Sequence, residues 1–216
     1  MSELIFQPEL SLNIANASTE PPLRKRPKPG ERRIQILEAL VTMLEKPGGE
    51  RITTSALATN LGVSEAALYR HFASKAQMFE GLIEFIEQSV FTLVNQISER
   101  ETDHVQCARK LVTMIFQFAE KNPGMARVMV GDALVFENDR LQERMNHFFD
   151  KLESSLKQSL RFALTSSGAA TPLIDTQVRA SVILSFIVGR LQRFARSGFK
   201  RLPSEHLDAT LAIILV

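Results

Sequence analysis

The stretch 61-LGVSEAALYRHFASK-75 sets small and polar side chains between regularly spaced apolar residues. Gly62 can end one short helix at its C′ position, and Ser64 can cap the next helix. Leu68 and Phe72 lie four residues apart and face the same way, which leaves small and polar groups on the opposite helix face. A low face of this kind can enter the major groove of DNA, where a bulky apolar face could not. The stretch therefore predicts the second half of a helix-turn-helix.

Residues upstream supply the first half of that motif. Apolar residues at three- and four-residue spacings predict the inner face of a first helix that ends at "KPGGE", namely Ile34, Leu37, Leu40, Val41 and Leu44. A short second helix can begin with Thr53 or Thr54 as its cap and bury Leu57 and Leu61. A helix, a glycine-containing turn and a second short helix together make a helix-turn-helix.

Several residues in and just after the helix that Ser64 caps have an expected role at DNA. Glu65, Ala67 and Arg70 belong to the low face that would meet the groove. Tyr69 and His71 lie at the far end of the same helix, within reach of phosphate oxygens. The full set of expected DNA contacts is Arg26, Arg32, Arg33, Thr53, Thr54, Ser64, Glu65, Ala67, Tyr69, Arg70, His71 and Lys75.

The following helix adds an expected phosphate site. Ser74 and Gln77 form a capping box, and the helix N-terminus together with Lys75 can hold an anion. Each residue also has a simpler explanation, because serines cap helices in any protein and a single histidine such as His71 is ordinarily a surface residue. The combination is more specific than its members, since the caps, the low helix face and a basic segment converge on one end of the molecule.

The basic segment follows an unusual N-terminal arm. Residues 1–30 begin with few charges and pass through "EPP" and "PKPG". Six cations then stand against the single acid Glu31, namely Arg24, Lys25, Arg26, Lys28, Arg32 and Arg33. This composition predicts a disordered arm that leads into a basic junction, and a solvated linker is the alternative explanation.

Length and composition narrow the class of protein. A chain of 216 residues can bury a real core, and its formal net charge of +2 leaves both nucleic acid and protein partners open. No uninterrupted apolar run approaches the roughly 20 residues of a bilayer helix, so we expect a soluble, intracellular chain with no membrane span. The lone Cys107 excludes an internal disulfide, and its helical apolar context predicts a core residue.

The sequence carries no signature of catalysis. We find no paired acid and base at a mechanistic spacing, no ligand cluster among the four histidines, and no glycine-rich phosphate loop before a helix. We therefore expect that the protein is not an enzyme and requires neither a metal ion nor a cofactor.

The C-terminal region predicts long helices with more apolar surface than one chain of this size can cover. "ASVILSFIVGRLQRF" is apolar around much of its circumference, and "LDATLAIILV" is a second apolar helix. Pairing both with their copies about a two-fold axis would bury them in a four-helix interface, where Gly189 permits close approach. The expected interface residues are Val182, Phe186, Ile187, Gly189 and Arg190. The alternative is that these helices form the interior of one larger bundle.

The segment "RITTSALATNLGVSEAALYRHFASKAQMF" resembles the DNA-binding domain of the TetR family. That family has a threonine at the start of its second helix and a Tyr-x-His-Phe-x-x-Lys ending, which match Thr53, Tyr69, His71, Phe72 and Lys75. The resemblance implies an all-α protein that binds double-stranded palindromic DNA as a homodimer. The implied order is an arm at 1–30, a three-helix helix-turn-helix domain at 31–76, and a helical dimerisation and partner-binding bundle at 77–216.

Other segments resemble a branch of this family that regulates bacterial cell division. They are "VSEAALYRHF", "LIEFIE", "KNPGMARVMVGDALVFENDRLQERMN" and "RFARSGFKRLP". The resemblance implies a nucleoid-associated, cytoplasmic factor that binds the division protein FtsZ while on DNA and blocks septum formation over the chromosome. It places FtsZ against Phe85, Leu93, Lys121 and Asn122, although that branch has arginines at the positions of Leu93 and Lys121. The alternative function is a transcriptional repressor that responds to a small ligand held in the C-terminal bundle.

Overall fold

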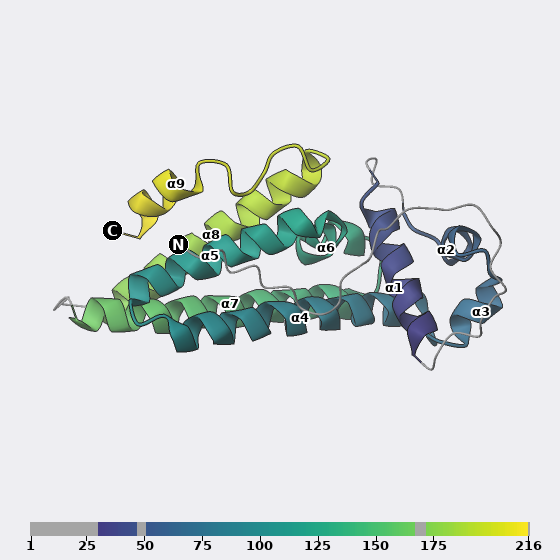
Figure 1. Cartoon of the computed structure of the whole chain (residues 1–216), viewed down its shortest axis with the longest axis horizontal. Coiled ribbons are helices and arrows are strands. Elements are labelled where there is room, and N and C mark those ends of the chain that lie inside the picture. Colours follow the sequence, from purple (N-terminus) through teal and green to yellow (C-terminus); the bar gives the residue numbers. More distant parts are fainter. Residues whose placement is uncertain (1–29, 47–50, 167–171, 216) are drawn as a thin grey trace.

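The computed structural model describes residues 30–46, 51–166 and 172–215. These residues form helices and connecting turns (Figure 1). The helices in order are α1 (Glu31–Leu44), α2 (Thr54–Asn60), α3 (Glu65–Tyr69), α4 (Lys75–Arg100), α5 (His104–Lys121), α6 (Pro123–Met129), the short 3₁₀ helix η1 (Asp132–Leu134), α7 (Asp139–Ser166), α8 (Pro172–Arg196) and α9 (Leu207–Ile214). The described part of the chain contains no strand, so the predicted all-α fold class is confirmed.

Helices α1, α2 and α3 form a small unit at one end of the molecule (Figure 1). Leu68 and Phe72 are fully buried in it, as their spacing predicts. The turn between α2 and α3 contains Gly62 at φ 64°, a left-handed conformation that favours glycine. The predicted inner face of α1 is wrong at its first turn, because Ile34 is 46% exposed and Ile36 is buried instead.

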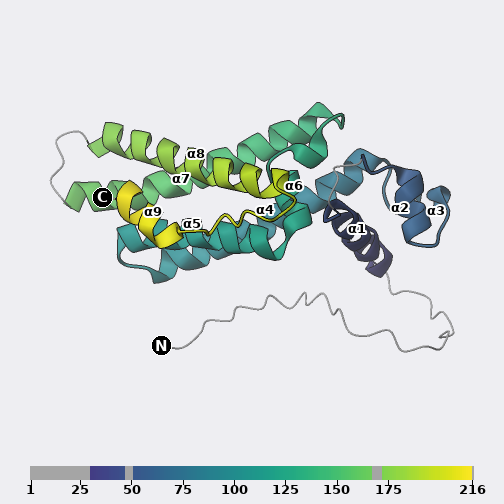
Figure 2. The same cartoon turned by 90° about the horizontal axis from the view of Figure 1, so that it is seen from above.

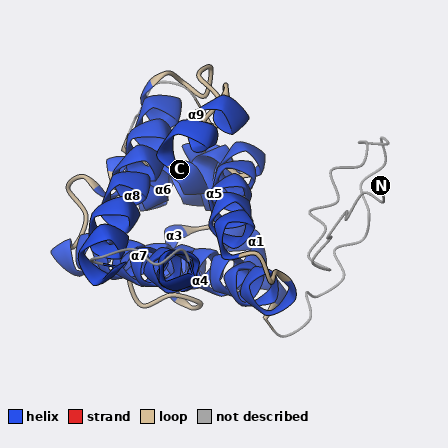
Figure 3. Ribbon diagram, turned by 90° about the vertical axis from the view of Figure 1, so that its left-hand side faces the viewer, coloured by secondary structure: helices blue, strands red, loops and turns tan. Residues whose placement is uncertain are grey.

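The rest of the chain forms an elongated body of long helices. Seen end-on, α4, α5, α7 and α8 surround a common interior (Figure 3). Figure 2 shows α7 and α8 lying side by side along the body, and α9 follows the connection that returns from the end of α8. The interior includes edge-on ring contacts, such as Phe91 with Phe148 and Phe116 with Phe186.

The short helix α6 connects the body to α1. A Cβ atom at Gly124 would lie 2.5 Å from the backbone oxygen of Val41, so this close approach requires glycine. Arg127 is buried, donates to the backbone oxygen of Leu44 at 3.1 Å, and pairs with Asp132 at 2.6 Å. The end of α1 is thereby fixed to the body. The helices expected from the sequence do not include α6 or η1.

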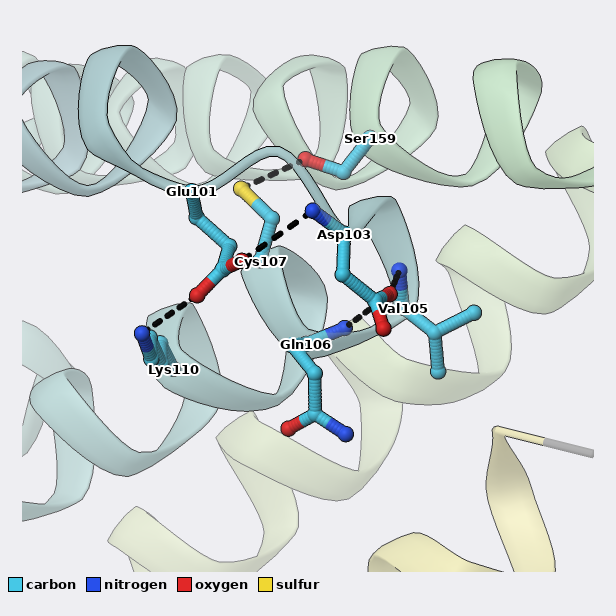
Figure 4. A network of polar contacts seen from close by, with 7 residues as sticks. All are labelled: Glu101, Asp103, Val105, Gln106, Cys107, Lys110 and Ser159. Atoms are coloured by element: carbon cyan, nitrogen blue, oxygen red, sulfur yellow. Dashed lines mark hydrogen bonds and ion pairs between the residues drawn. The ribbon is translucent and has the colours of Figure 1, made fainter.

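The turn between α4 and α5 has its own polar network (Figure 4). Asp103 caps α5 by accepting from the backbone N–H groups of Val105 and Gln106 at 2.9 and 3.0 Å. Lys110 donates to Glu101 and lowers the pKa of that carboxyl. Cys107 is buried and accepts a hydrogen bond from the Ser159 hydroxyl at 3.3 Å, which confirms the core position predicted for this thiol.

The described residues contain neither a membrane-spanning helix nor a cluster of metal ligands. None of their helices is both long and apolar enough to cross a bilayer. Their histidine, cysteine and carboxylate side chains nowhere gather in a group of three or more that could hold a metal ion.

Candidate functional site

The two short helices of the helix-turn-helix are held by their own polar side chains. The Thr53 hydroxyl accepts from the backbone N–H of Ala56 at 3.1 Å, and the Ser64 hydroxyl accepts from that of Ala67 at 3.3 Å. Both residues are therefore N-caps, whatever else they contact. The Thr54 hydroxyl donates to the Glu65 carboxylate at 2.7 Å and so joins the start of α2 to the start of α3.

The outer face of α3 is open to solvent. Glu65 and Arg70 are exposed, Ala67 is half-buried, and Tyr69 is 46% exposed. His71 is exposed just beyond the helix. These residues lie on the outside of a unit whose inner side is closed by buried apolar residues. The arrangement leaves a low, polar helix face free to approach a duplex.

Arg33 has a structural partner at the end of α3. Its guanidinium donates to the backbone oxygen of His71 at 2.8 Å and lies 4.1 Å from the centroid of the Phe72 ring. Arg32 donates to the side chain of Gln35 at 3.0 Å. Arg33 therefore ties α1 to the end of α3, through a contact between residues 38 positions apart that no local pattern predicts. Arg26 lies outside the described residues.

Among the residues expected to contact DNA, Lys75 is the one whose contact within the protein would compete most strongly with a phosphate. It forms an ion pair with Glu137 in the turn between η1 and α7, and its side chain is 18% exposed. Arg51 approaches the same carboxylate at 3.8 Å and donates to the backbone oxygen of Phe136 at 3.3 Å. Lys75 must leave Glu137 before it can neutralise a phosphate. Sequence reasoning missed this pair because its members are 62 residues apart and no local pattern connects them.

Replacing Glu137 with glutamine should release Lys75 toward DNA. We expect Glu137→Gln to raise affinity for every duplex alike and to steepen the dependence of log K on log salt by about one unit, since one more phosphate would be neutralised. Titrations at several salt concentrations measure the slope. Glu143→Gln, at an exposed position of α7, makes the same change in net charge and serves as the control. Equal slopes for the two variants would remove Lys75 from the DNA contacts.

Tyr69 provides a direct optical test of the reading helix. The chain has one tyrosine and no tryptophan, so tyrosine emission reports this position alone. We expect a cognate palindrome to change the intensity or anisotropy of that emission, because the exposed ring would meet the duplex. Tyr69→Phe should abolish the signal while the gel shift remains as a measure of binding. Constant emission during a complete gel shift would mean that α3 does not face DNA.

Helix α8 carries an exposed apolar stripe along the outside of the body. Ile174, Val178 and Val182 are 64%, 56% and 51% exposed, at spacings of four residues. Gly189 continues the stripe, and a Cβ atom there would meet no other atom within 4 Å. Three turns of one helix thus present β-branched apolar residues to solvent, and this surface is suited to pairing with another α8.

The other predicted interface residues are less exposed than this stripe. Ile187 is 1% exposed and belongs to the interior of its own protomer, so its side chain is unavailable to a partner. Phe186 is half-buried against Phe116, and the Arg190 guanidinium lies 5.2 Å from the Phe186 ring centroid. The sequence of α8 is apolar around much of its circumference, so its pattern does not distinguish the inner face from the outer face.

The residues expected to hold a protein partner lie along α4 and at the end of α5. Phe85 and Leu93 are half-buried and pack against the core, eight residues or about 12 Å apart along the helix axis. Lys121 is exposed in the last turn of α5. The Asn122 amide donates to the backbone oxygen of Phe118 at 2.8 Å and so caps the end of that helix.

An open groove of about 750 Å³ lies between α4 and α7. Its lining mixes charged side chains, hydroxyls, an imidazole and one phenylalanine ring, namely Glu87, Phe91, Arg144, His147, Asp150, Lys151, Ser154 and Ser155. Arg144 donates two hydrogen bonds to the Glu87 carboxylate, and these raise the pKa of Arg144. Because Phe85 and Glu87 point about 200° apart on α4, the groove lies on the other side of the helix from the predicted partner surface.

Comparison with known proteins agrees with this description. Residues 36–82 match the family described as "Bacterial regulatory proteins, tetR family", and residues 102–215 match the SlmA-like family described as "Tetracyclin repressor-like, C-terminal domain". The chain is 50% identical over 178 residues to the nucleoid occlusion factor SlmA of Idiomarina loihiensis, which covers 82% of this chain and 90% of that protein. It is also 50% identical over 182 residues to SlmA of Photobacterium profundum, with coverage of 84% and 92%.

Solved structures share the fold at lower identity. The fatty acid degradation regulator FadR of Bacillus halodurans superposes with a TM-score of 0.68 and 20% identity, covering 88% of this chain and 97% of that chain. FadR of Bacillus subtilis in complex with stearoyl-CoA gives a TM-score of 0.66 at 17% identity, with coverage of 84% and 97%.

A helix-turn-helix at one end of a helical body, together with these matches, defines a DNA-binding regulator and not an enzyme. The chain belongs to the TetR family, in its SlmA branch of nucleoid occlusion factors.

Proposed function

We propose that the protein binds palindromic DNA as a homodimer and, while bound, holds the division protein FtsZ and blocks septum formation over the chromosome. The observation that carries this proposal is the 50% identity to SlmA proteins across most of the chain. The proposal divides the chain into a DNA-binding unit at 31–76, a dimerisation and partner-binding bundle at 77–216, and an N-terminal arm at 1–30 that adds cations at the junction. The protein would be nucleoid-associated.

The contacts of the described residues support the DNA-binding part. The face of α3 with Glu65, Arg70 and Tyr69 is exposed to solvent, while the caps of α2 and α3 hold its geometry. Tyr69 and His71 would contact phosphates from the end of α3. Arg33 would act mainly by positioning α3, since its guanidinium already binds the backbone oxygen of His71.

The exposed stripe of α8 supports the dimer. In the two-fold arrangement, one α8 packs on the other through Val178, Val182 and Gly189, with α9 beside it. Two recognition helices would then be held at a half-site spacing of about 34 Å or a related distance. A dimer of this kind reads two half-sites at once, and a monomer reads only one.

A ligand-responsive repressor is the second candidate function. The likeness in fold to a regulator solved with stearoyl-CoA favours it, and at 17% identity that likeness concerns the fold alone. The groove that the described residues form lies on the surface between α4 and α7 and is lined by charges, which suits a lipophilic effector poorly.

The deciding experiment uses purified FtsZ. Polymers are formed with GTP, the protein is added with or without its cognate duplex, and light scattering follows the polymer mass. The proposed function predicts loss of polymers that depends on the duplex. Polymers that persist with the fully DNA-bound protein would contradict it, and a small molecule that releases DNA would then support the repressor.

A further inference from the structure

The end of α8 and the connection to α9 carry a concentration of positive charge to which the proposed function gives no role. Between Asp175 and Glu205 the sequence contains six basic residues and no acidic one, in a chain whose net charge is only +2. Four of these cations are exposed at the end of α8 and just after it, namely Arg193, Arg196, Lys200 and Arg201. Their side chains take part in none of the ion pairs found within 30–46, 51–166 and 172–215.

The first part of this connection, residues 197–204, is held in a defined conformation, and we call it the cationic loop. Helix α8 ends in a Schellman motif, in which the N–H of Phe199 donates to the oxygen of Phe194 at 3.0 Å and that of Gly198 to the oxygen of Ala195 at 3.2 Å. The rings of Phe194 and Phe199 lie 5.3 Å apart, which is the apolar contact typical of that motif. Phe199 itself has φ 66°, an uncommon value for a residue with a side chain.

Polar contacts also fix both halves of the cationic loop. The Ser197 hydroxyl accepts from the backbone N–H groups of Lys200 and Arg201 at 3.1 and 2.9 Å. The N–H of Ser204 donates to the Glu120 carboxylate at 3.0 Å, which anchors the loop on the end of α5. Figures 1 and 2 show the loop lying along the outside of the body, over α5. Because the loop is preorganised, a partner would bind it at a low cost in conformational entropy.

An exposed apolar side chain stands beside these cations. Leu202 is 49% exposed and directly follows Lys200 and Arg201, and Phe199, which precedes them, is half-buried. Nucleic acid would be held by phosphate contacts to the cations and would make little use of Leu202. A polypeptide can use both features, since its carboxylates pair with the cations and an apolar side chain packs on Leu202. A second copy of the loop would be repelled by its like charge.

We propose that the cationic loop is a docking surface for an acidic polypeptide segment that also carries apolar side chains. The surface is separate from the α3 face that approaches DNA and from Phe85 and Leu93 on α4. It rests on the end of α5, where the Ser204 N–H donates to the Glu120 carboxylate. The partner would therefore be held by charge at the end of α8 and by contact with Leu202.

The test compares three fluorescent probes on the full-length protein at low salt. The probes are a short Asp-rich peptide with two leucines, the same peptide with serines in their place, and a non-cognate duplex, and anisotropy reports binding. Lys200→Glu with Arg201→Glu should weaken binding of the leucine peptide by about tenfold or more. Leu202→Ser should weaken the leucine peptide several-fold and leave the serine peptide unchanged. Lys151→Glu with Lys157→Glu on α7 makes the same change in net charge and should have little effect.

Three results would overturn the proposal. Equal loss of duplex and peptide binding, with no effect of Leu202→Ser, would make the loop a nucleic-acid surface. No loss with any probe would leave its cations as solvated side chains. Sedimentation of the charge-reversed variant as monomers would assign the loop to an interface between copies of the chain. The FtsZ assay does not enter this test, so the proposed function and the docking surface can fail separately.

Discussion

Replacing Val182 with lysine is expected to separate the protein into monomers and to weaken its binding to palindromic DNA by about two orders of magnitude or more. Val182 is 51% exposed on α8, so the protomer itself has room for the longer side chain. In a two-fold α8 pairing, the same position would place a charge in an apolar interface, at a cost of several kcal/mol. Loss of the dimer removes simultaneous binding to two half-sites. Affinity for the palindrome should therefore fall far more than affinity for a duplex with a single half-site.

Sedimentation and gel shifts measure the two effects on the same sample. Gln158→Lys, at an exposed polar position of α7, is the matched control and should remain dimeric. Circular dichroism should show equal helix content for both variants, because neither side chain is buried in the protomer. Ile187→Lys would not test the interface, since Ile187 is 1% exposed and the change would disrupt the core. A Val182→Lys dimer of undiminished strength would place the interface away from α8.

The helix-turn-helix was predictable because its signals are local. Gly62 at the turn and the caps Thr53 and Ser64 act within a few residues of their positions, and the structure shows all three in those roles. The burial of Leu68 and Phe72 follows from a spacing of four residues. Short-range hydrogen bonds and helix periodicity carry this information, and neither depends on the rest of the fold.

Contacts between distant segments were not predictable in this way. Glu137 neutralises Lys75 across 62 residues, and nothing near either residue indicates that pairing. The choice of Ile36 over Ile34 as the buried residue of α1 depends on how α1 packs against α2, α4 and α6. Likewise, the apolar residues of α8 outnumber those that its inner face can hold. Packing against α7, α5 and α6 decides that Ile187 is buried and Val182 is exposed.

Changing Phe85 to alanine together with Lys121 to glutamate is expected to abolish the effect on FtsZ polymers while leaving DNA affinity unchanged. Lys121 is exposed in the last turn of α5, and reversing its charge would repel an acidic segment of the partner. Phe85 is half-buried and packs on the core, so its truncation costs less than the about 3–5 kcal/mol of a fully buried phenylalanine. The protein should therefore remain folded while the partner loses an aromatic anchor and a charge.

The chain offers a closely matched control on the opposite side of α4. Phe91 is also a half-buried phenylalanine of that helix, and Lys151 is an exposed lysine whose ammonium lies 5.9 Å from its ring centroid. Phe91→Ala with Lys151→Glu makes the same chemical changes as the first pair, in the groove between α4 and α7. It should keep full activity against polymers if the partner docks beside Phe85. Thermal melts of both variants establish that any difference is not a loss of folding.

The pattern of results across the two variants identifies the surface. Loss of activity in the Phe85 and Lys121 variant alone would support docking on α4 and the end of α5. Loss in the Phe91 and Lys151 variant alone would move the partner into the groove between α4 and α7. If both variants keep full activity, neither side of α4 holds FtsZ. Because each variant retains the α3 face and the α8 stripe, unchanged gel shifts on the palindrome show that a lost effect on polymers reflects partner binding and not DNA binding.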